Sequence, residues 1–201
     1  MPARVAVIYY SSTGHVHQLA REVHDGAREA GSEVRLLRAA ELAPQSVIDG
    51  EPDWYANQQA TKDIPEAALD DLLWADAYVF GTPTRYGNVS AQLKQFLDTT
   101  GGLWFEGKLA DKIVSGFTSA DETHGGQETT ITSMYNVFMH WGAIIVPLGY
   151  TDGVVSAAGG NPYGASSTHR ASNPTKEELA AAHYQGRRVA ETAARFVRGR
   201  V

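Results

Sequence analysis

No cysteine occurs among the 201 residues of the chain. This absence excludes disulfides, iron–sulfur clusters, thiolate metal sites and thiol nucleophiles. Any redox chemistry must therefore use a bound cofactor. His15 and His17 form a lone His-x-His, which is not a metal site by itself, and no His-Glu-x-x-His motif occurs. We expect no bound metal.

Long apolar runs and basic stripes are also missing. No stretch approaches the roughly 20 apolar residues of a membrane span, and the apolar run from Val5 to Tyr10 is too short for a signal peptide. The formal charge of −6, without a Lys/Arg-rich stripe, argues against nucleic acid or an anionic membrane as the main partner. We expect a cytoplasmic protein that binds a small ligand.

What the chain does contain is the composition of a globular protein, with 43% apolar and 20% charged residues. Its length fits one α/β domain spanning 1–201. Short β-branched and aromatic runs alternate with stretches whose apolar residues recur every three or four positions. Strands are predicted at Val5–Tyr10, Glu33–Arg38, Ala77–Gly81, Lys112–Phe117 and Ala143–Val146. Helices are predicted between Gly14 and Gly31 and at Val89–Thr99, Thr129–Trp141 and Lys176–Arg198.

This alternation predicts right-handed crossovers and a doubly wound parallel sheet covered by helices on both faces, a three-layer α/β/α arrangement. Five strands fit the flavodoxin-like order 2-1-3-4-5. Two connections, 39–65 and 151–175, lack this rhythm. Connections this long in a compact domain are usually functional or lie in an interface.

Ligands of a doubly wound sheet bind beyond the carboxyl ends of the strands, where the strand order reverses. The first loop there offers three hydroxyls and the backbone N–H groups of a helix N-terminus, which together cradle an anion. It contains no Lys or Arg and neither a Gly-x-Gly-x-x-Gly nor a Gly-Lys-Ser/Thr motif, so a terminal phosphomonoester fits best. The alternative is simple helix capping. The candidate residues are Ser11, Ser12, Thr13, Gly14, His15 and Val16.

The loops after the third and fourth strands are equally unusual. In the second loop, Pro83 fixes the backbone and glycines allow a flat ring to approach main-chain N–H groups. Arg85 could offset charge that grows at N1 and O2 of a reduced flavin, and the alternative is a turn with a solvated Arg. The third loop suits the far side of such a ring. The candidates are Pro83, Thr84, Arg85, Tyr86, Gly87 and Asn88, then Thr118, Ser119, Ala120, Asp121, Gly125 and Gly126.

At this point the chain resembles the WrbA family of flavodoxin-like NAD(P)H:quinone oxidoreductases. Matching stretches follow the family order along nearly the whole chain: 9–11, 14–15, 80–88, 96–98, 101–104, 125–129, 140–142 and 160–165. The resemblance implies non-covalent FMN, with residues 11–16 on the phosphate, 84–86 on the isoalloxazine and 119–125 along the ring and ribityl chain. It also implies NADH or NADPH as donor, a quinone as acceptor, and a homotetramer with active sites near subunit contacts.

Two aromatic positions take their roles from the resemblance. It implies that His140 reaches the flavin and that Trp104 forms a wall of the substrate pocket. We therefore expect Arg85 and His140 to be catalytic, and Trp104 and Thr13 to bind substrate. The alternatives are that His140 is a core histidine bonded to a backbone carbonyl and that Trp104 is only an interface anchor. Trp54 and Tyr55 are interpreted as subunit contacts.

Two departures from the family mark where this chain differs. Some members carry an aromatic residue at the position of Thr13, which leaves the nicotinamide choice open. Asp121 and Glu122 stand where other members have small residues, and their charge would lower the flavin potential if it faces the ring. The expected reaction is two-electron reduction of a quinone by ping-pong hydride transfer. The alternatives are a one-electron carrier flavodoxin and a non-enzymatic regulatory flavoprotein.

Overall fold

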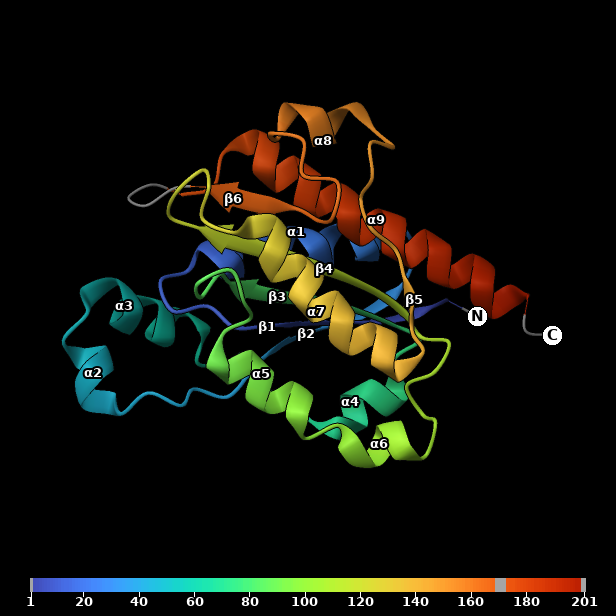
Figure 1. Ribbon diagram of the computed structural model, residues 1–201, viewed down its shortest axis with the longest axis horizontal. Coiled ribbons are helices and arrows are strands. Elements are labelled where there is room, and N and C mark those ends of the chain that lie inside the picture. The colour runs from blue at the N-terminus through green and yellow to red at the C-terminus, as the bar shows by residue number, and fades with distance from the viewer. Residues whose placement is uncertain (1, 169–172, 200–201) are drawn as a thin grey trace.

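The computed structural model describes residues 2–168 and 173–199. A parallel sheet in the order β2-β1-β3-β4-β5 lies between two layers of helices (Figure 1). This confirms the predicted flavodoxin-like order and the three layers. The strands are β1 Arg4–Tyr9, β2 Glu33–Arg38, β3 Ala77–Pro83, β4 Ile113–Ala120, β5 Ile144–Ile145 and β6 Ser166–Thr168. The helices are α1 His15–Glu29, α2 Gln45–Asp49, α3 Pro52–Thr61, α4 Leu69–Trp74, α5 Ala91–Asp98, α6 Gly101–Phe105, α7 Gln127–Trp141, α8 Gly153–Ala157 and α9 Lys176–Arg198.

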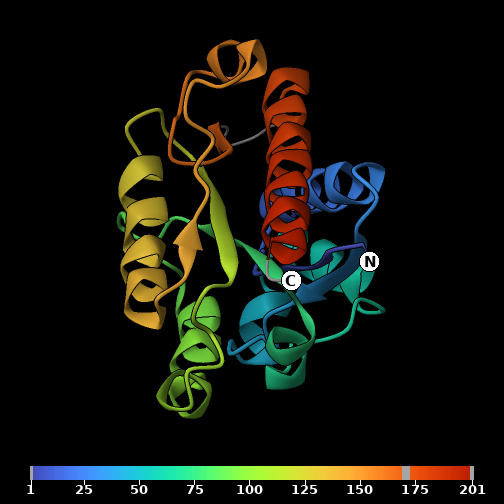
Figure 2. The same cartoon turned by 90° about the vertical axis from the view of Figure 1, so that its right-hand side faces the viewer.

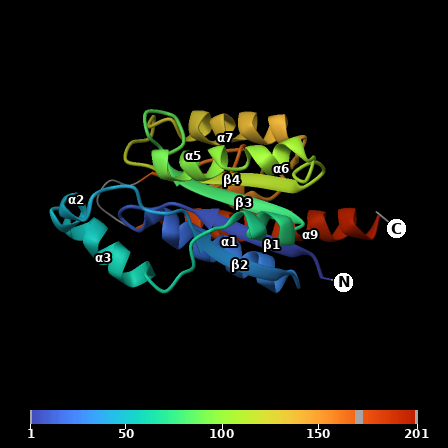
Figure 3. The same ribbon diagram turned by 90° about the horizontal axis from the view of Figure 1, so that it is seen from below.

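Alternating side chains of the central strands divide the core between the two faces of the sheet. Val5, Val7 and Tyr9 of β1 pack with residues of α1 and α9. Ala6 and Ile8 face the opposite way, toward α4, α5 and α7. Figure 2 shows α7 and α9 on opposite sides of the sheet, and Figure 3 shows the same layers from below. Both faces are covered, which explains why these strands read as continuous apolar runs.

The carboxyl ends of β3 and β4 extend beyond their predicted limits. Thr82 and Thr118 are fully buried there, and the Thr118 hydroxyl donates to the Thr82 carbonyl. Paired polar side chains therefore continue strands whose apolar pattern has ended. On its other edge β4 pairs with β5 at Ile113 and Val114, and with β6 at residues 118–120. The predicted strand 143–146 is shorter than expected, and β6 had no periodic signal.

The two long connections contain helices that the sequence pattern did not predict. Connection 39–65 folds into α2 and α3, which lie beside the carboxyl ends of the strands (Figure 1). Within α3 only Thr61 is buried, so the sequence of this helix lacks the apolar stripe from which a helix can be predicted. Connection 151–175 contains α8 and β6, and its residues 169–172 lie outside the described part of the chain.

Helices α1 and α9 approach one another backbone to backbone. A Cβ atom added at Gly26 would lie 2.0 Å from the carbonyl oxygen of His183, and one at Gly186 would lie 2.0 Å from that of Val23. Glycine is therefore required at both positions by the close packing rather than by the backbone conformation. This contact fixes α1, and with it the loop that precedes α1.

We predict that Gly26→Ala lowers the free energy of unfolding by about 1–3 kcal/mol, because the methyl group forces two packed backbones apart. Urea unfolding followed by circular dichroism measures the loss. The control is Gly101→Ala in α6, where nothing lies within 4 Å of the added Cβ. The control should change stability by no more than about 0.5 kcal/mol. Equal effects of the two substitutions would contradict the packing argument.

Candidate functional site

The carboxyl ends of β1, β3 and β4 open onto a cavity of about 660 Å³, hereafter the first cavity. Residues of all three predicted loops line it, because parallel strands bring their carboxyl ends to one edge of the sheet. Figure 1 shows these loops together at the end of the molecule that also carries α2 and α3. The lining residues are Ser12, Thr13, His15, Pro83, Thr84, Arg85, Tyr86, Ser119, Ala120, Asp121, Glu122 and Gly125.

The first loop is shaped to present backbone N–H groups. Gly14 adopts a left-handed conformation with φ 95°, and no side chain caps the N-terminus of α1. The Ser11 hydroxyl accepts a hydrogen bond from the Gly14 N–H at 3.0 Å and so closes the loop on itself. The uncapped first turn of α1 leaves the positive end of the helix dipole available to an anion.

Arg85 supplies the positive charge that the first loop lacks. Its guanidinium donates to the Ser12 hydroxyl at 3.4 Å and to the Thr84 carbonyl at 2.9 Å. The side chain therefore reaches from the second loop to the first, at the end of the cavity where the anion cradle lies. The predicted place of Arg85 beside the flavin N1 and O2 stays a prediction; what the structure adds is the contact with Ser12.

The second loop is a tight turn that projects Tyr86 into solvent. Arg85 and Asn88 exchange backbone hydrogen bonds of 2.8 and 3.1 Å. The central residues Tyr86 and Gly87 both have positive φ, 54° and 76°, as in a type I′ turn. Such a conformation is strained for tyrosine and leaves its side chain fully exposed. Tyr86 is thereby held as an outer wall of the first cavity.

Thr84 ties the second loop to the third. Its hydroxyl donates to the Gly125 carbonyl at 3.2 Å and accepts from the Gly87 N–H and the Thr130 hydroxyl at 3.1 and 2.7 Å. A Cβ at Gly126 would lie 2.8 Å from the Gly87 Cα, so the two loops touch through glycine backbones. Glycine at position 126 therefore lets the second and third loops contact each other directly, which fixes their relative position at the edge of the cavity.

Charge is divided along the first cavity. Arg85 lies at the first loop, whereas Asp121 and Glu122 line the wall formed by the third loop. Several predicted cofactor residues shape the loops without lining the cavity, and Val16 and Thr118 are buried beneath it. The predicted residues that do not line it are Ser11, Gly14, Val16, Gly87, Asn88, Thr118 and Gly126.

Trp104 and His140 lie at the other end of α7 from the first cavity. Helix α7 begins at the third loop, and His140 lies in its last turn, about 20 Å away at 1.5 Å per residue. The Trp104 indole N–H donates to the His140 carbonyl at 2.8 Å, and both residues are exposed. The alternative of a core histidine is therefore wrong. Within one chain neither side chain lines the cavity.

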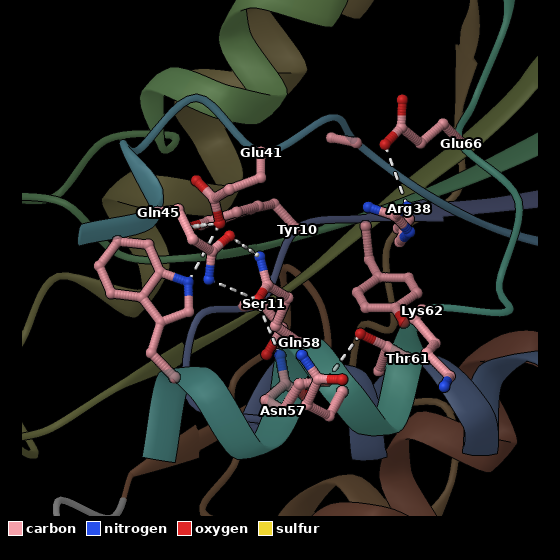
Figure 4. A pocket seen from close by; sticks show the side chains of 14 residues that line it. Tyr10, Ser11, Arg38, Glu41, Gln45, Asn57, Gln58, Thr61, Lys62 and Glu66 are labelled. Atoms are coloured by element: carbon pink, nitrogen blue, oxygen red, sulfur yellow. Dashed lines mark hydrogen bonds and ion pairs between the residues drawn. The ribbon is translucent and has the colours of Figure 1, made fainter. Parts of the chain in front are cut away.

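Glu41 and Asn57 brace the first loop, and sequence reasoning missed both. The Glu41 carboxylate accepts hydrogen bonds from the Tyr10 hydroxyl and the Trp54 indole, each at 3.0 Å (Figure 4). It also accepts from the Gln92 amide and from two backbone N–H groups. Asn57 of α3 donates to the Ser11 carbonyl at 2.8 Å. Trp54, interpreted above as a subunit contact, thus holds its own chain together.

This network keeps Glu41 ionised and Tyr10 neutral. Burial alone raises the pKa of Glu41. The hydrogen bonds from Ala43, Gln92, Tyr10 and Trp54 together lower it by more than burial raises it, so the pKa lies below its usual range. Burial and the Glu41 carboxylate raise the pKa of Tyr10, with opposition from Arg85. The tyrosine therefore remains a hydrogen-bond donor at every physiological pH.

We predict that Glu41→Gln lowers the free energy of unfolding at pH 7 by about 1 kcal/mol, because one charge-assisted acceptor site is lost at a half-buried position. Because the pKa of Glu41 is lower in the folded state, ionised Glu41 stabilises the fold at pH values above the usual Glu pKa of about 4.3. This stabilisation is lost as the pH falls through the folded-state pKa. The difference from wild type should therefore shrink below about pH 4. Urea unfolding at pH 7 and pH 3 tests this, with exposed Glu106→Gln as control. A difference that persists at pH 3 would contradict it.

Comparisons with known proteins agree with this geometry. Residues 3–158 match the model of a family described as NADPH-dependent FMN reductase. The chain belongs to this family. A Deinococcus radiodurans protein named NAD(P)H dehydrogenase (quinone) is 48% identical over 196 residues, covering 98% of each chain. One of that name from Aromatoleum aromaticum is 44% identical, covering 98% of this chain and 99% of its own.

Solved structures give the same result. A flavodoxin, WrbA-like protein from Agrobacterium tumefaciens superimposes with a TM-score of 0.70 and 26% identity, covering 96% of this chain and 98% of that one. An archaeal flavodoxin superimposes with a TM-score of 0.63 over 95% of this chain and 99% of its own, at 17% identity, and shows the shared fold alone. The family model, the relatives named NAD(P)H dehydrogenase (quinone) and the Agrobacterium tumefaciens structure confirm the resemblance to the WrbA family.

Proposed function

We propose that this chain is an FMN-dependent NAD(P)H:quinone oxidoreductase that reduces quinones by two electrons. The observation that carries the proposal is the first cavity, with an uncapped helix N-terminus and Arg85 at one end and the second and third loops, tied together by Thr84, along its wall. FMN fits this arrangement, because it joins a phosphomonoester to a flat ring. The family description names FMN, which supports this cofactor. The relatives' names include NAD(P)H and quinone, which supports these two substrates.

The parts of FMN can be matched to the residues that line the cavity. In this proposal Ser12, Thr13 and the first turn of α1 would bind the phosphate, and the Arg85 guanidinium would neutralise it. Thr84, Tyr86 and residues 119–125 would contact the ring and the ribityl chain. FMN, when bound, supplies the two-electron transfer between nicotinamide and quinone. The protein orients each substrate against the ring in turn, which is the ping-pong order.

The aromatic content of the first cavity favours an oxidoreductase over a one-electron carrier. Carriers of the flavodoxin type sandwich the flavin between aromatic side chains. Among the described residues that line this cavity, Tyr86 is the one Phe, Tyr or Trp, and it projects outward. One face of the ring would therefore stay open for a second flat molecule.

We predict that the FMN-loaded protein oxidises NADH or NADPH with benzoquinone as acceptor. Arg85→Gln should raise the FMN dissociation constant about tenfold, because a charge-assisted phosphate contact of roughly 1.4 kcal/mol is lost. Titration of apoprotein by flavin fluorescence measures this affinity, with exposed Lys108→Gln as the matched control. Absence of quinone-dependent oxidation with FMN bound would overturn the proposed function.

We also propose a homotetramer in which Trp104 and His140 act at the first cavity of a neighbouring copy. Around α6 and the end of α7, the side chains of Trp104, Phe105 and Met139 are 51%, 85% and 58% exposed. A surface this apolar is typical of a protein interface. Such an interface would bring Trp104 and His140 of one copy to the first cavity of another, although they lie about 20 Å from the cavity of their own chain.

We predict that Phe105→Asp reduces the particle from tetramer to smaller species, because a charge in an apolar interface is costly. Size-exclusion chromatography with light scattering measures the mass. Val47→Asp is the control, since Val47 is 48% exposed on α2, far from α6. A wild-type protein that is monomeric at micromolar concentration would refute the tetramer.

The predictions of location and domain organisation remain proposals. Within residues 2–168 and 173–199, none of the helices has the length and apolar character to cross a bilayer. We propose that the protein acts in the cytoplasm as one domain, residues 1–201. Cell fractionation tests the location, and membrane-bound protein would contradict it.

A further inference from the structure

A second cavity, of about 460 Å³, lies on the other side of the first loop. Ser11 lines this second cavity, whereas the next residues, Ser12 and Thr13, line the first. One loop thus separates the two. The ends of β1 and β2 and the helices α2 and α3 enclose the second cavity (Figure 4). The proposed reaction assigns it no role.

The two ends of the second cavity differ in what they offer a ligand. At one end, five hydrogen bonds already satisfy the Glu41 carboxylate. At the other end lie Arg38 and Lys62 (Figure 4). A negative charge in the cavity would therefore be held at the Arg38 end, away from Glu41.

The two cations retain unused hydrogen-bond donors. Arg38 donates from Nε to the Ile64 carbonyl at 2.9 Å, and its Nη2 forms an ion pair with Glu66 at 3.1 Å. Among the described residues, its Nη1 forms neither a hydrogen bond nor an ion pair. No described residue forms a hydrogen bond or ion pair with the Lys62 ammonium. Because Glu66 is 51% exposed, solvent weakens its pairing with Arg38. Arg38 and Lys62 both line this end of the cavity, and both kinds of side chain bind phosphate.

Flat and amide groups complete the wall. Tyr10 and Trp54 contribute aromatic rings at the Glu41 end. The side-chain amides of Gln45 and Gln58 pair with each other at 3.1 Å across the opening. Each of these amides carries hydrogen-bond donors and an acceptor, as does the edge of a heterocyclic base, so the amides and a base can form hydrogen bonds with each other. The cavity volume lies within the roughly 300–1,000 Å³ typical of small-molecule sites.

We propose that the second cavity binds a phosphorylated nucleoside, with its phosphomonoester at Arg38 and Lys62 and its base toward Tyr10 and Trp54. One source of this phosphorylated nucleoside is NADPH, whose adenosine ribose carries a phosphate that NADH lacks; this part of the inference rests on the proposed function. Its nicotinamide would lie in the first cavity and its adenosine across the first loop, so the site selects NADPH over NADH. The other source is a separate nucleotide that binds beside the flavin site.

The test is calorimetric titration of the full FMN-loaded chain with adenosine 2′-monophosphate. Adenosine should bind at least tenfold more weakly, because it lacks the phosphate. Lys62→Gln should weaken binding of the monophosphate about fivefold without unfolding the protein, since Lys62 has no partner among the described residues. Arg38→Gln should weaken it further. Lys108→Gln should leave it unchanged, because Lys108 is exposed and follows α6, which lies at the opposite end of the molecule from α2 and α3 (Figure 3).

Steady-state kinetics then separate the two sources. Competitive inhibition of NADPH oxidation by adenosine 2′-monophosphate, with a reduced preference for NADPH over NADH in Lys62→Gln, identifies the dinucleotide. Non-competitive inhibition identifies a separate nucleotide. Either result supports the site.

Three results would overturn the inference: no binding of the monophosphate, binding that neither Lys62→Gln nor Arg38→Gln weakens, or equal affinity for inorganic phosphate and the nucleotide. The calorimetry needs no turnover. A protein that binds the nucleotide but reduces no quinone therefore refutes the proposed function alone. An active enzyme without nucleotide binding refutes this inference alone.

Discussion

The parallel hydrogen-bonded pairing of β1, β3 and β4 is the constraint on which the rest of the structure depends. Its register sets Tyr9 opposite Gly81 and Pro83 opposite Ser119, so three loops begin at one edge of the sheet. Each loop alone is a polar turn of ambiguous purpose. Held side by side, they line one cavity, with the anion cradle at the first loop and the acidic wall at the third. Both faces of the sheet are covered, which makes that edge the place for a ligand.

The loops are held in place by a few long-range hydrogen bonds. Thr84 joins the second loop to the third, and Arg85 joins the second to the first. Asn57 and the Glu41 network join α3 to the first loop from the opposite side. Helix α3 therefore serves two cavities at once, since the loop that it braces is the wall between them. A preorganised loop of this kind binds a ligand without a further cost of ordering.

Local physical rules were enough to predict most of the layers. Apolar runs such as Val5–Tyr10 and the stripe of α1 reveal the central strands and long helices, because their burial is periodic. The rules failed where burial is not periodic. Helix α3 buries one residue and contacts the first loop through a hydrogen bond from Asn57. The carboxyl ends of β3 and β4 contain polar residues that are nevertheless buried. The short strand β6 depends on its partner β4 and carries no signal of its own.

The sequence by itself determined the doubly wound sheet, the three loops at its edge and, through its motifs, the family to which the chain belongs. These properties depend on residues that are close in the sequence or repeat at a fixed period. Only the tertiary structure decided that Arg85 reaches Ser12, that Glu41 satisfies Tyr10, Trp54 and Gln92, and that the Trp104 indole donates to the His140 carbonyl. Partners such as Ser12 and Arg85, 73 positions apart, meet because the packed sheet and helices bring them together.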